Sequence, residues 1–166
     1  MSGIGNPDLL ARLRMTTLTF EELARLDGEE LGSANNPYAV IGLTISKAVV
    51  KAAANLNSAS RGVALKSKAA SETGQHEIEV GFAKPQRGFG VFYRAPRATS
   101  ITVKTLDGQG TVLEEAAFPG GEGYAGVIRA RAEIERGRIV ASMETFEAQS
   151  AGFYIDDFSF GRELKS

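Results

Sequence analysis

The fold is decided by the closing segment of the chain, residues 152–161, which reads GFYIDDFSFG. Its apolar residues alternate on either side of Asp156 and Asp157, and alternation with a period of two is typical of a strand with one buried face. Two adjacent carboxylates in such a strand repel each other, and aspartate is depleted in strands. We therefore expect a nearby group to offset this charge, and a metal ion is the first candidate. The segment predicts both an anchor of the fold and a site.

The composition is that of one ordinary globular domain. Of 166 residues, 43% are hydrophobic and 23% are charged, and the formal net charge is -1. A net charge this small gives no electrostatic footprint for nucleic acid or an anionic membrane. No apolar run in the sequence approaches the length of a membrane span. The absence of cysteine excludes disulfides, thiol catalysis and cysteine-ligated zinc.

The N-terminal part begins with a helix signal. In residues 6–14 an asparagine can cap the helix, a proline follows at the first helical position, and arginines end the segment. From Thr19 the sequence fits two structures. A capping box of Thr19 with Glu22 would start a helix that ends at Gly28, whereas residues 16–21 could instead be a strand. These local signals leave both structures open.

Most of the remaining chain divides into short strands. The 19 glycines fall mostly between short alternating apolar runs, and Asp107-Gly108 is a strong hairpin signal. Residues 47–54 fit a helix or a strand, and a turn at Arg136-Gly137 interrupts the strand that begins at Ile134. The predicted strands cover residues 38–46, 62–66, 77–82, 88–94, 100–105, 111–118, 124–129, 134–144 and 152–161. The sequence therefore predicts an all-β fold, a jelly-roll β-sandwich of two antiparallel sheets with a short N-terminal helix. We expect the helical segment at residues 1–14 and one sandwich domain at residues 15–166.

The order of several segments resembles a family of bacterial domains. It opens with Thr19-Phe20-Glu21-Glu22-Leu23, Asn36-Pro37-Tyr38 and the glycine-centred run at residues 40–46, and continues through residues 89–93, 101–113 and 124–127 to residues 153–160. This set resembles the jelly-roll domains of exported bacterial proteins that often carry a PEP-CTERM sorting signal. It is also similar in outline to carbohydrate-binding modules and MAM-type domains. Neither a signal peptide nor a sorting segment is visible in the sequence.

The resemblance implies a position for the chain ends and a metal site. In such domains the first strand lies beside the last, so the residues from Thr19 would belong to the first strand. A calcium ion between the two strands would be held by Glu21, or by Glu22, together with Asp156 or Asp157. Calcium takes six to eight oxygen ligands, which acids from both chain ends could supply. Such a site would be structural, and the resemblance implies an extracellular or surface-exposed location.

Two tyrosines are candidates for ligand binding. Sugar recognition uses aromatic rings at an exposed surface, and tryptophan is absent from the chain. Tyr154 alternates with Phe153 and Ile155, and Tyr93 follows Phe92. We therefore expect Tyr93 and Tyr154 to face away from the core, with their neighbours facing in.

No set of residues in the sequence indicates a reaction. His76 is the only histidine and is expected to be exposed in a loop, and no Gly-x-Ser-x-Gly elbow is present. Glu77 and Glu79 could form a pair of glycosidase carboxylates, but a solvated strand face explains them better. We expect the protein not to be an enzyme.

The sequence thus predicts a non-catalytic, calcium-stabilised β-sandwich module that binds carbohydrate or another surface polymer. The alternative is a structural or assembly subunit of a particle surface, a fibre or an extracellular layer, in which residues 6–14 pack on a neighbouring molecule. The expected partners are a polysaccharide or further copies of the chain, with no nucleic acid and no membrane insertion.

Overall fold

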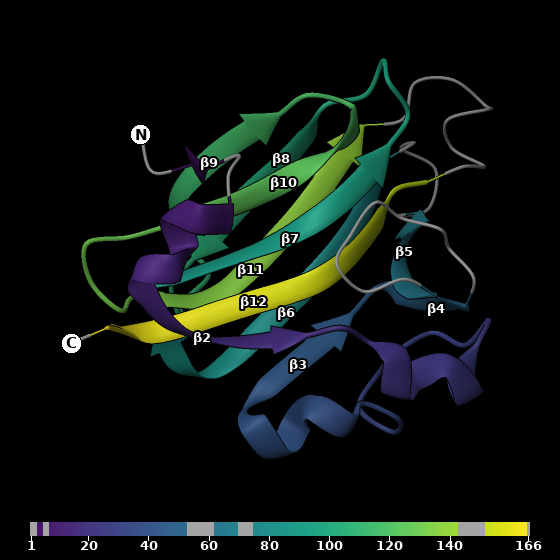
Figure 1. Ribbon diagram of the computed structural model, residues 1–166, viewed down its shortest axis with the longest axis horizontal. Coiled ribbons are helices and arrows are strands. Elements are labelled where there is room, and N and C mark those ends of the chain that lie inside the picture. The colour runs from purple at the N-terminus through teal and green to yellow at the C-terminus, as the bar shows by residue number, and fades with distance from the viewer. Residues whose placement is uncertain (1–2, 5–6, 53–61, 70–74, 143–151, 166) are drawn as a thin grey trace.

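Two antiparallel β-sheets pack face to face in the computed structural model of the chain (Figure 1). The structure describes residues 3–4, 7–52, 62–69, 75–142 and 152–165. Three predicted features lie outside this part of the chain: the helix cap Asn6, residues 53–54, and the strand end at Glu144. Within the described residues, no helix is long and apolar enough to cross a membrane.

Strands of 2 to 12 residues and three 3-10 helices of five or six residues form the regular elements of the described chain. The first half contains β1 (Gly3–Ile4), η1 (Pro7–Arg12), β2 (Leu13–Leu18), η2 (Glu21–Leu26), η3 (Pro37–Ile41), β3 (Leu43–Ser46) and β4 (Ala48–Ala52). The second half contains β5 (Val63–Ala69), β6 (Gln75–Gln86), β7 (Gly88–Ala95), β8 (Ile101–Leu106), β9 (Val112–Phe118), β10 (Gly121–Ile128), β11 (Ile134–Ser142) and β12 (Tyr154–Leu164).

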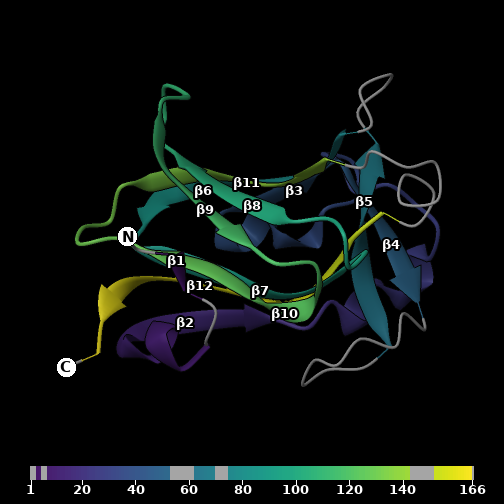
Figure 2. The same ribbon diagram turned by 90° about the horizontal axis from the view of Figure 1, so that it is seen from above.

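The strands form two layers that are joined at one end. Sheet one has the order β1-β10-β7-β12-β2, and sheet two has the order β3-β6-β11-β8-β9. β5 pairs with β12 of sheet one and with β6 of sheet two, and β4 pairs with β5. Figure 2 shows β5 and β4 across this end of the sandwich.

Eight of these strands have the topology of a jelly roll. Sheet one contains β2-β12-β7-β10 and sheet two contains β6-β11-β8-β9, so the chain changes sheet at most of its connections. Two four-stranded sheets exchanged in this way correspond to the two Greek keys of a jelly roll. The predicted fold class is confirmed. The six-residue strand β2 lies beside the last strand, β12.

Four phenylalanine rings join the two sheets in the core. The ring centroid of Phe158 on β12 lies 5.8 Å from that of Phe89 on β7 and 6.4 Å from that of Phe82 on β6. Phe160 lies 5.5 Å from Phe82. Burial of one such side chain contributes about 1.5–3 kcal/mol. The closing strand is therefore the anchor of the core, because its rings contact both sheets.

A β-bulge at Asp156 and Asp157 explains why the alternation of the closing strand breaks. Asp156 lies opposite Phe92 on β7 and Ser159 lies opposite Gly90, so three residues on β12 span the same length as two on β7. Asp157 has a left-handed φ of 47°, which aspartate tolerates better than most residues. The bulge absorbs the extra residue, so the apolar side chains before and after it all point into the core.

The strand predicted at residues 38–46 begins later than expected. Its first part is the 3-10 helix η3, and only its second part is the strand β3. The Asn36 side chain caps the helix by accepting the N–H of Tyr38, Pro37 occupies the first helical position, and Gly42 ends the helix with a φ of 77°. These three residues are a helix signal that the apolar alternation conceals.

The two structures left open at Thr19 both occur, one after the other. Strand β2 ends at Leu18, and helix η2 begins at Glu21 and ends before Gly28. Between them Phe20 takes a φ of 63° and places its side chain in the core. The expectation from the resemblance that the strand extends through Glu21 is therefore wrong, because Glu21 is the first residue of a helix.

Two further segments were predicted as either helix or strand, or as a turn, and both are strands in the structure. Residues 48–52 form a strand, β4, and β11 runs through the predicted turn at Arg136-Gly137. A Cβ atom at Gly137 would lie 2.6 Å from the Phe89 ring, so this glycine permits close packing of the two sheets instead of making a turn. The register shift between Ile134 and Arg136 is accommodated within the strand.

The N-terminal segment wraps around sheet one. β1 pairs with β10 at one edge, β2 pairs with β12 at the other, and η1 lies across the outer face between them (Figure 1). Leu10 and Leu13 are buried in a cluster with Tyr124. Leu10 and Leu13 thus pack on their own chain, and packing of residues 6–14 on a neighbouring molecule stays a prediction.

Candidate functional site

An open groove runs along the outer face of sheet one, beside η1 and β2. Its volume is about 450 Å³. Residues of η1, β2, β7, β10 and β12 line it, so it is held by the strands of the sheet and not by long loops. One side of the groove is polar and the other is apolar.

The polar residues that line the groove carry hydroxyl groups, the carboxylate of Asp157 and the amino group of Lys165. Thr17 Oγ1 and Ser159 Oγ lie 2.7 Å apart across the β2–β12 pair, and Thr19 follows Thr17 on the same face of the strand. Asp157 is 5% exposed and lines the groove, and its backbone N–H donates to Oδ1 of Asp156 at 2.7 Å. The bulge therefore fixes a carboxylate next to a pair of hydroxyls.

The apolar side carries two aromatic rings under the N-terminal helix. The ring centroids of Phe92 and Tyr124 lie 5.1 Å apart in an edge-to-face arrangement. A Cβ atom at Gly90 would collide with the Tyr124 ring and with Leu10, so the missing side chain makes room for both. Burial raises the pKa of the Tyr124 hydroxyl, which keeps it a neutral hydrogen-bond donor.

The two glutamates predicted as calcium ligands are engaged at η2. The Glu21 carboxylate accepts the backbone N–H of Val63 at 3.3 Å. The Glu22 carboxylate accepts the hydroxyl of Tyr38 at 2.5 Å, and burial together with this carboxylate raises the pKa of Tyr38. Both glutamates are exposed, and these contacts attach η2 to β5 and η3.

The two aspartates predicted as calcium ligands are both buried in the bulge. Asp156 is 1% exposed and Asp157 is 5% exposed. A simple alternation would turn one of these two neighbouring residues to solvent, but both are buried. Among the residues that the structure describes, no three Asp, Glu, His or Cys side chains are grouped closely enough to hold a metal ion. Glu21, Glu22, Asp156 and Asp157 therefore do not form one four-carboxylate site, and calcium binding stays a prediction.

The two tyrosines predicted to bind ligand face in opposite directions. Tyr154 is half-buried on the outer face of sheet one. Tyr93 is 4% exposed in the core, where its hydroxyl donates to the carbonyl of Pro119 at 2.6 Å and burial raises its pKa. The expectation that Tyr93 faces away from the core is wrong, because Phe92 takes the outward position. A binding role for Tyr154 stays a prediction.

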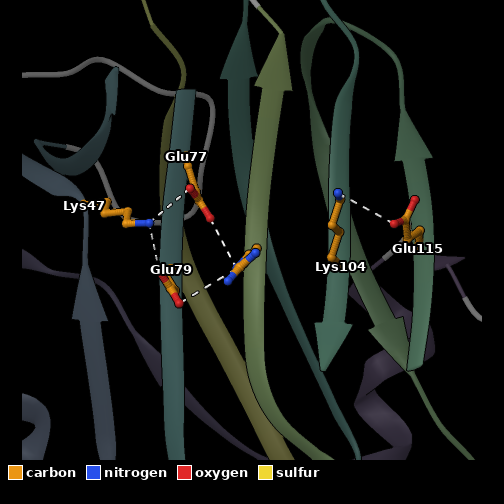
Figure 3. Close-up of polar contacts among 6 residues, drawn as sticks. Lys47, Glu77, Glu79, Lys104 and Glu115 are labelled. Carbon is orange, nitrogen blue, oxygen red and sulfur yellow. Dashed lines mark hydrogen bonds and ion pairs between the residues drawn. The ribbon is translucent and has the colours of Figure 1, made fainter. Parts of the chain in front are cut away.

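Ion pairs cross the outer face of sheet two (Figure 3). Lys47 Nζ lies 3.2 Å from carboxylate oxygens of both Glu77 and Glu79. Arg138 Nε lies 3.3 Å from Glu77 and 3.8 Å from Glu79. The two carboxylates considered for glycosidase chemistry therefore each contact two cations. Pairs this exposed contribute about 0–1 kcal/mol each, and they link β6 to β11 and to the start of β4.

His76 is buried, which corrects the expectation of an exposed loop histidine. It is 3% exposed, and its Nδ1 lies 2.9 Å from Oγ of Ser67. The same oxygen accepts the backbone N–H of Phe153 at 2.9 Å. This contact joins β5, β6 and the start of the closing segment in the protein interior.

Sequence reasoning missed the groove residues Thr17, Ser159, Phe92 and Tyr124. A signal exists, since Met15 and Thr17 on β2 and Thr19 just after it alternate in the sequence and all line the groove. Outward-facing polar residues occur on every strand, however, so alternation alone does not select these. The groove appears only when β2, β12 and β7 are placed side by side.

Among the comparisons with known proteins, only the one with solved structures finds similar proteins. No protein-family model matches the chain, and no curated protein matches it, so the resemblance to PEP-CTERM-associated domains stays a prediction. Among solved structures, TmCBM61 in complex with β-1,4-galactotriose is 15% identical with a TM-score of 0.47, covering 88% of this chain and 97% of that one. CsCBM6-3 from Clostridium stercorarium in complex with cellobiose is 11% identical with a TM-score of 0.42, covering 89% and 94%. The module CBM6cm-2 from Cellvibrio mixtus lichenase 5A in complex with cellotriose is 9% identical with a TM-score of 0.41, covering 82% and 98%. At these identities the ligands of the similar proteins do not carry over to this chain.

Proposed function

We propose that the chain is a carbohydrate-binding β-sandwich module whose binding site is the groove on the outer face of sheet one. One observation carries the proposal: Thr17, Ser159 and Asp157 line the same groove as Phe92 and Tyr124. A sugar ring presents apolar C–H faces and hydroxyl edges, so its binding requires both kinds of surface.

The size and support of the groove suit such a ligand. A volume of about 450 Å³ lies within the usual range of small-ligand sites, roughly 300–1,000 Å³. The groove is built on paired strands, so its polar groups are held in place before a ligand arrives. Preorganisation of this kind lowers the entropic cost of binding.

Calcium stabilisation is part of the proposal, restricted to Asp156 and Asp157. The donors near the bulge are carboxylate and hydroxyl oxygens, which is the donor type that calcium takes. Two carboxylates supply only part of its usual six to eight ligands, so the fit is partial. Glu21 and Glu22 lie at η2, where their carboxylates accept hydrogen bonds from Val63 and Tyr38, and we do not include them in this set.

We propose a binding role without catalysis for this site. The paired carboxylates Glu77 and Glu79 lie on the opposite sheet and contact cations. His76 and Ser67 are enclosed in the interior, away from the groove.

Affinity electrophoresis through a panel of soluble neutral and acidic polysaccharides tests the proposal, followed by calorimetric titration of any that retard the protein. We expect at least one polysaccharide to bind, and Asp157→Asn to weaken binding about tenfold, because a hydrogen bond to a charged group contributes about 1.5–3 kcal/mol. Asparagine keeps the left-handed backbone at this position. Asp107→Asn, in the β8–β9 hairpin of the other sheet, is the matched control and should bind like the wild type.

The same titrations run with EDTA and with added calcium test the metal. Calcium should raise the melting temperature of the wild type and not that of Asp156→Asn, because a ligand bound only by the native state stabilises it. No binding to any polysaccharide, together with a mass that rises with protein concentration, would contradict the module and favour an assembly subunit.

A further inference from the structure

Three side chains form a row across three neighbouring strands on the outer face of sheet one. Tyr154 on β12 lies opposite Lys66 on β5 and opposite Arg94 on β7. The guanidinium carbon of Arg94 lies 5.0 Å from the centroid of the Tyr154 ring, and Nζ of Lys66 lies 5.9 Å from it. All three side chains are half-buried. We name Lys66, Tyr154 and Arg94 the cationic row.

The ring of Tyr154 holds a cation and is not an open stacking platform. A guanidinium stacked on an aromatic face has a restricted orientation, and its planar fork matches a carboxylate bidentately. Less entropy is then lost when it binds an anion than for a mobile arginine. The ring also packs against Ala64, which fixes its own position. Tyr154 is therefore a positioning residue for Arg94.

The cationic row continues the groove. On β7, Arg94 follows Phe92 by two residues, and residues two apart share one face of a strand about 6.6 Å from each other. On β10, Tyr124 lies opposite Phe92 and Glu122 lies opposite Arg94. A linear polymer that contacts Phe92 in the groove therefore reaches Arg94 with its next part.

We propose that the cationic row binds the carboxylate of an acidic polysaccharide, a polymer that contains uronic acid, while the groove binds its neutral hydroxyls. This inference rests on the proposed function and names the ligand class of the same surface. Arg94 and Lys66 attract an acid group at the cationic row, whereas the groove is lined by two residues of opposite charge, Asp157 and Lys165.

Glu122 provides a test of opposite sign. It is exposed, and its strand position is directly across from Arg94. A bound uronate would therefore lie between an attractive arginine and a repulsive glutamate. Removal of the glutamate charge should strengthen binding of an acidic polymer and leave binding of a neutral one unchanged.

The experiment compares matched pairs of polysaccharides by calorimetric titration of the full chain at low ionic strength. Polygalacturonate, alginate and a glucuronate polymer are each paired with their methyl ester, which keeps the backbone and removes the charge. We expect at least one acidic polymer to bind about tenfold tighter than its ester, a preference that added salt reduces. Arg94→Gln should remove this preference, and Glu122→Gln should increase it.

Controls separate the charge from its position. Arg97→Gln removes an equal charge from the exposed turn after β7 and should keep the preference. Tyr154→Leu should reduce the preference and Tyr154→Phe should restore it, because the ring and not the hydroxyl holds the guanidinium. If each acidic polymer and its ester bind equally well, and Arg94→Gln does not change this, the proposal of an acidic ligand is wrong. The proposal that the groove binds carbohydrate would still stand. Absence of binding to every acid and every ester would overturn both the ligand class and the groove.

Discussion

The buried hydroxyl of Ser67 serves two other groups at once. It accepts the N–H of Phe153 and bonds Nδ1 of His76, both at 2.9 Å. We expect Ser67→Ala to lower the free energy of unfolding by about 1–3 kcal/mol, because two buried polar groups lose this partner. Urea denaturation followed by circular dichroism measures the change. Ser142→Ala, at the exposed end of β11, should stay within about 0.5 kcal/mol of the wild type, and an equally small loss in Ser67→Ala would contradict the role of the contact.

Single residues also show where sequence reasoning failed. Tyr93 was assigned to the wrong face because both faces of β7 are covered in its middle, one by the core and the other by η1. Apolar residues then occur at consecutive positions, and period two no longer tells inside from outside. His76 gave no signal either, since its burial depends on Ser67 and on Phe153 far along the chain.

At the scale of one element, the bulge in β12 sets the phase of the strand that anchors the core. Three residues of β12 span two of β7 at this bulge, so deletion of Asp157 leaves a regular strand in which Phe158 and Phe160 still point into the core. We therefore expect the variant that lacks Asp157 to unfold cooperatively, measured by circular dichroism. Deletion of Ser159 makes Phe158 and Phe160 adjacent, so only one of them can face the core, and this variant should lose cooperative unfolding. A Ser159 deletion that melts close to the wild type would show that the phase does not matter.

The ends of β12 were predictable and its middle was not. The apolar alternation on both sides of Asp156 and Asp157 identified the buried face, and the break between the two halves was visible. Its cause, a left-handed residue that faces β7, depends on pairing with a strand about sixty positions earlier. The groove is a product of the same pairing, so its residues could not be selected from local patterns.

At the scale of the whole molecule, buried tyrosines predict how stability depends on alkaline pH. Burial raises the pKa values of Tyr38, Tyr93 and Tyr124, and Glu22 raises that of Tyr38 further. Tyrosines of the unfolded chain ionise near pH 10, so above this pH the unfolded chain binds fewer protons than the folded one. The free energy of unfolding should then fall as pH rises, by up to about 1.4 kcal/mol per pH unit for each tyrosine. Urea titrations from pH 8 to pH 11 measure the slope. A free energy that stays constant above pH 10 would contradict it.

The fold class followed from the sequence, but the arrangement of the strands did not. Many short alternating runs separated by glycine predict a sandwich, because each run can bury only one face. The strands β4 and β5 across one end, and the path of the N-terminal segment around sheet one, depend on long-range pairing. The proposed site lies where those long-range contacts meet, which is why it was the least predictable part.

The wrap of the N-terminal segment around sheet one also bears on how copies of the chain avoid one another. β1 pairs with Gly126 and Val127 of β10, and β2 pairs with the second half of β12, so one stretch of chain protects part of both sides of the same sheet. An uncovered strand edge presents backbone donors and acceptors that recruit a strand from another molecule. Loss of residues 3–18 would uncover both sides at once, and a sheet that can be extended in two directions grows into open-ended fibrils instead of stopping at a pair. We therefore expect the N-terminal segment to protect sheet one against strand-to-strand aggregation.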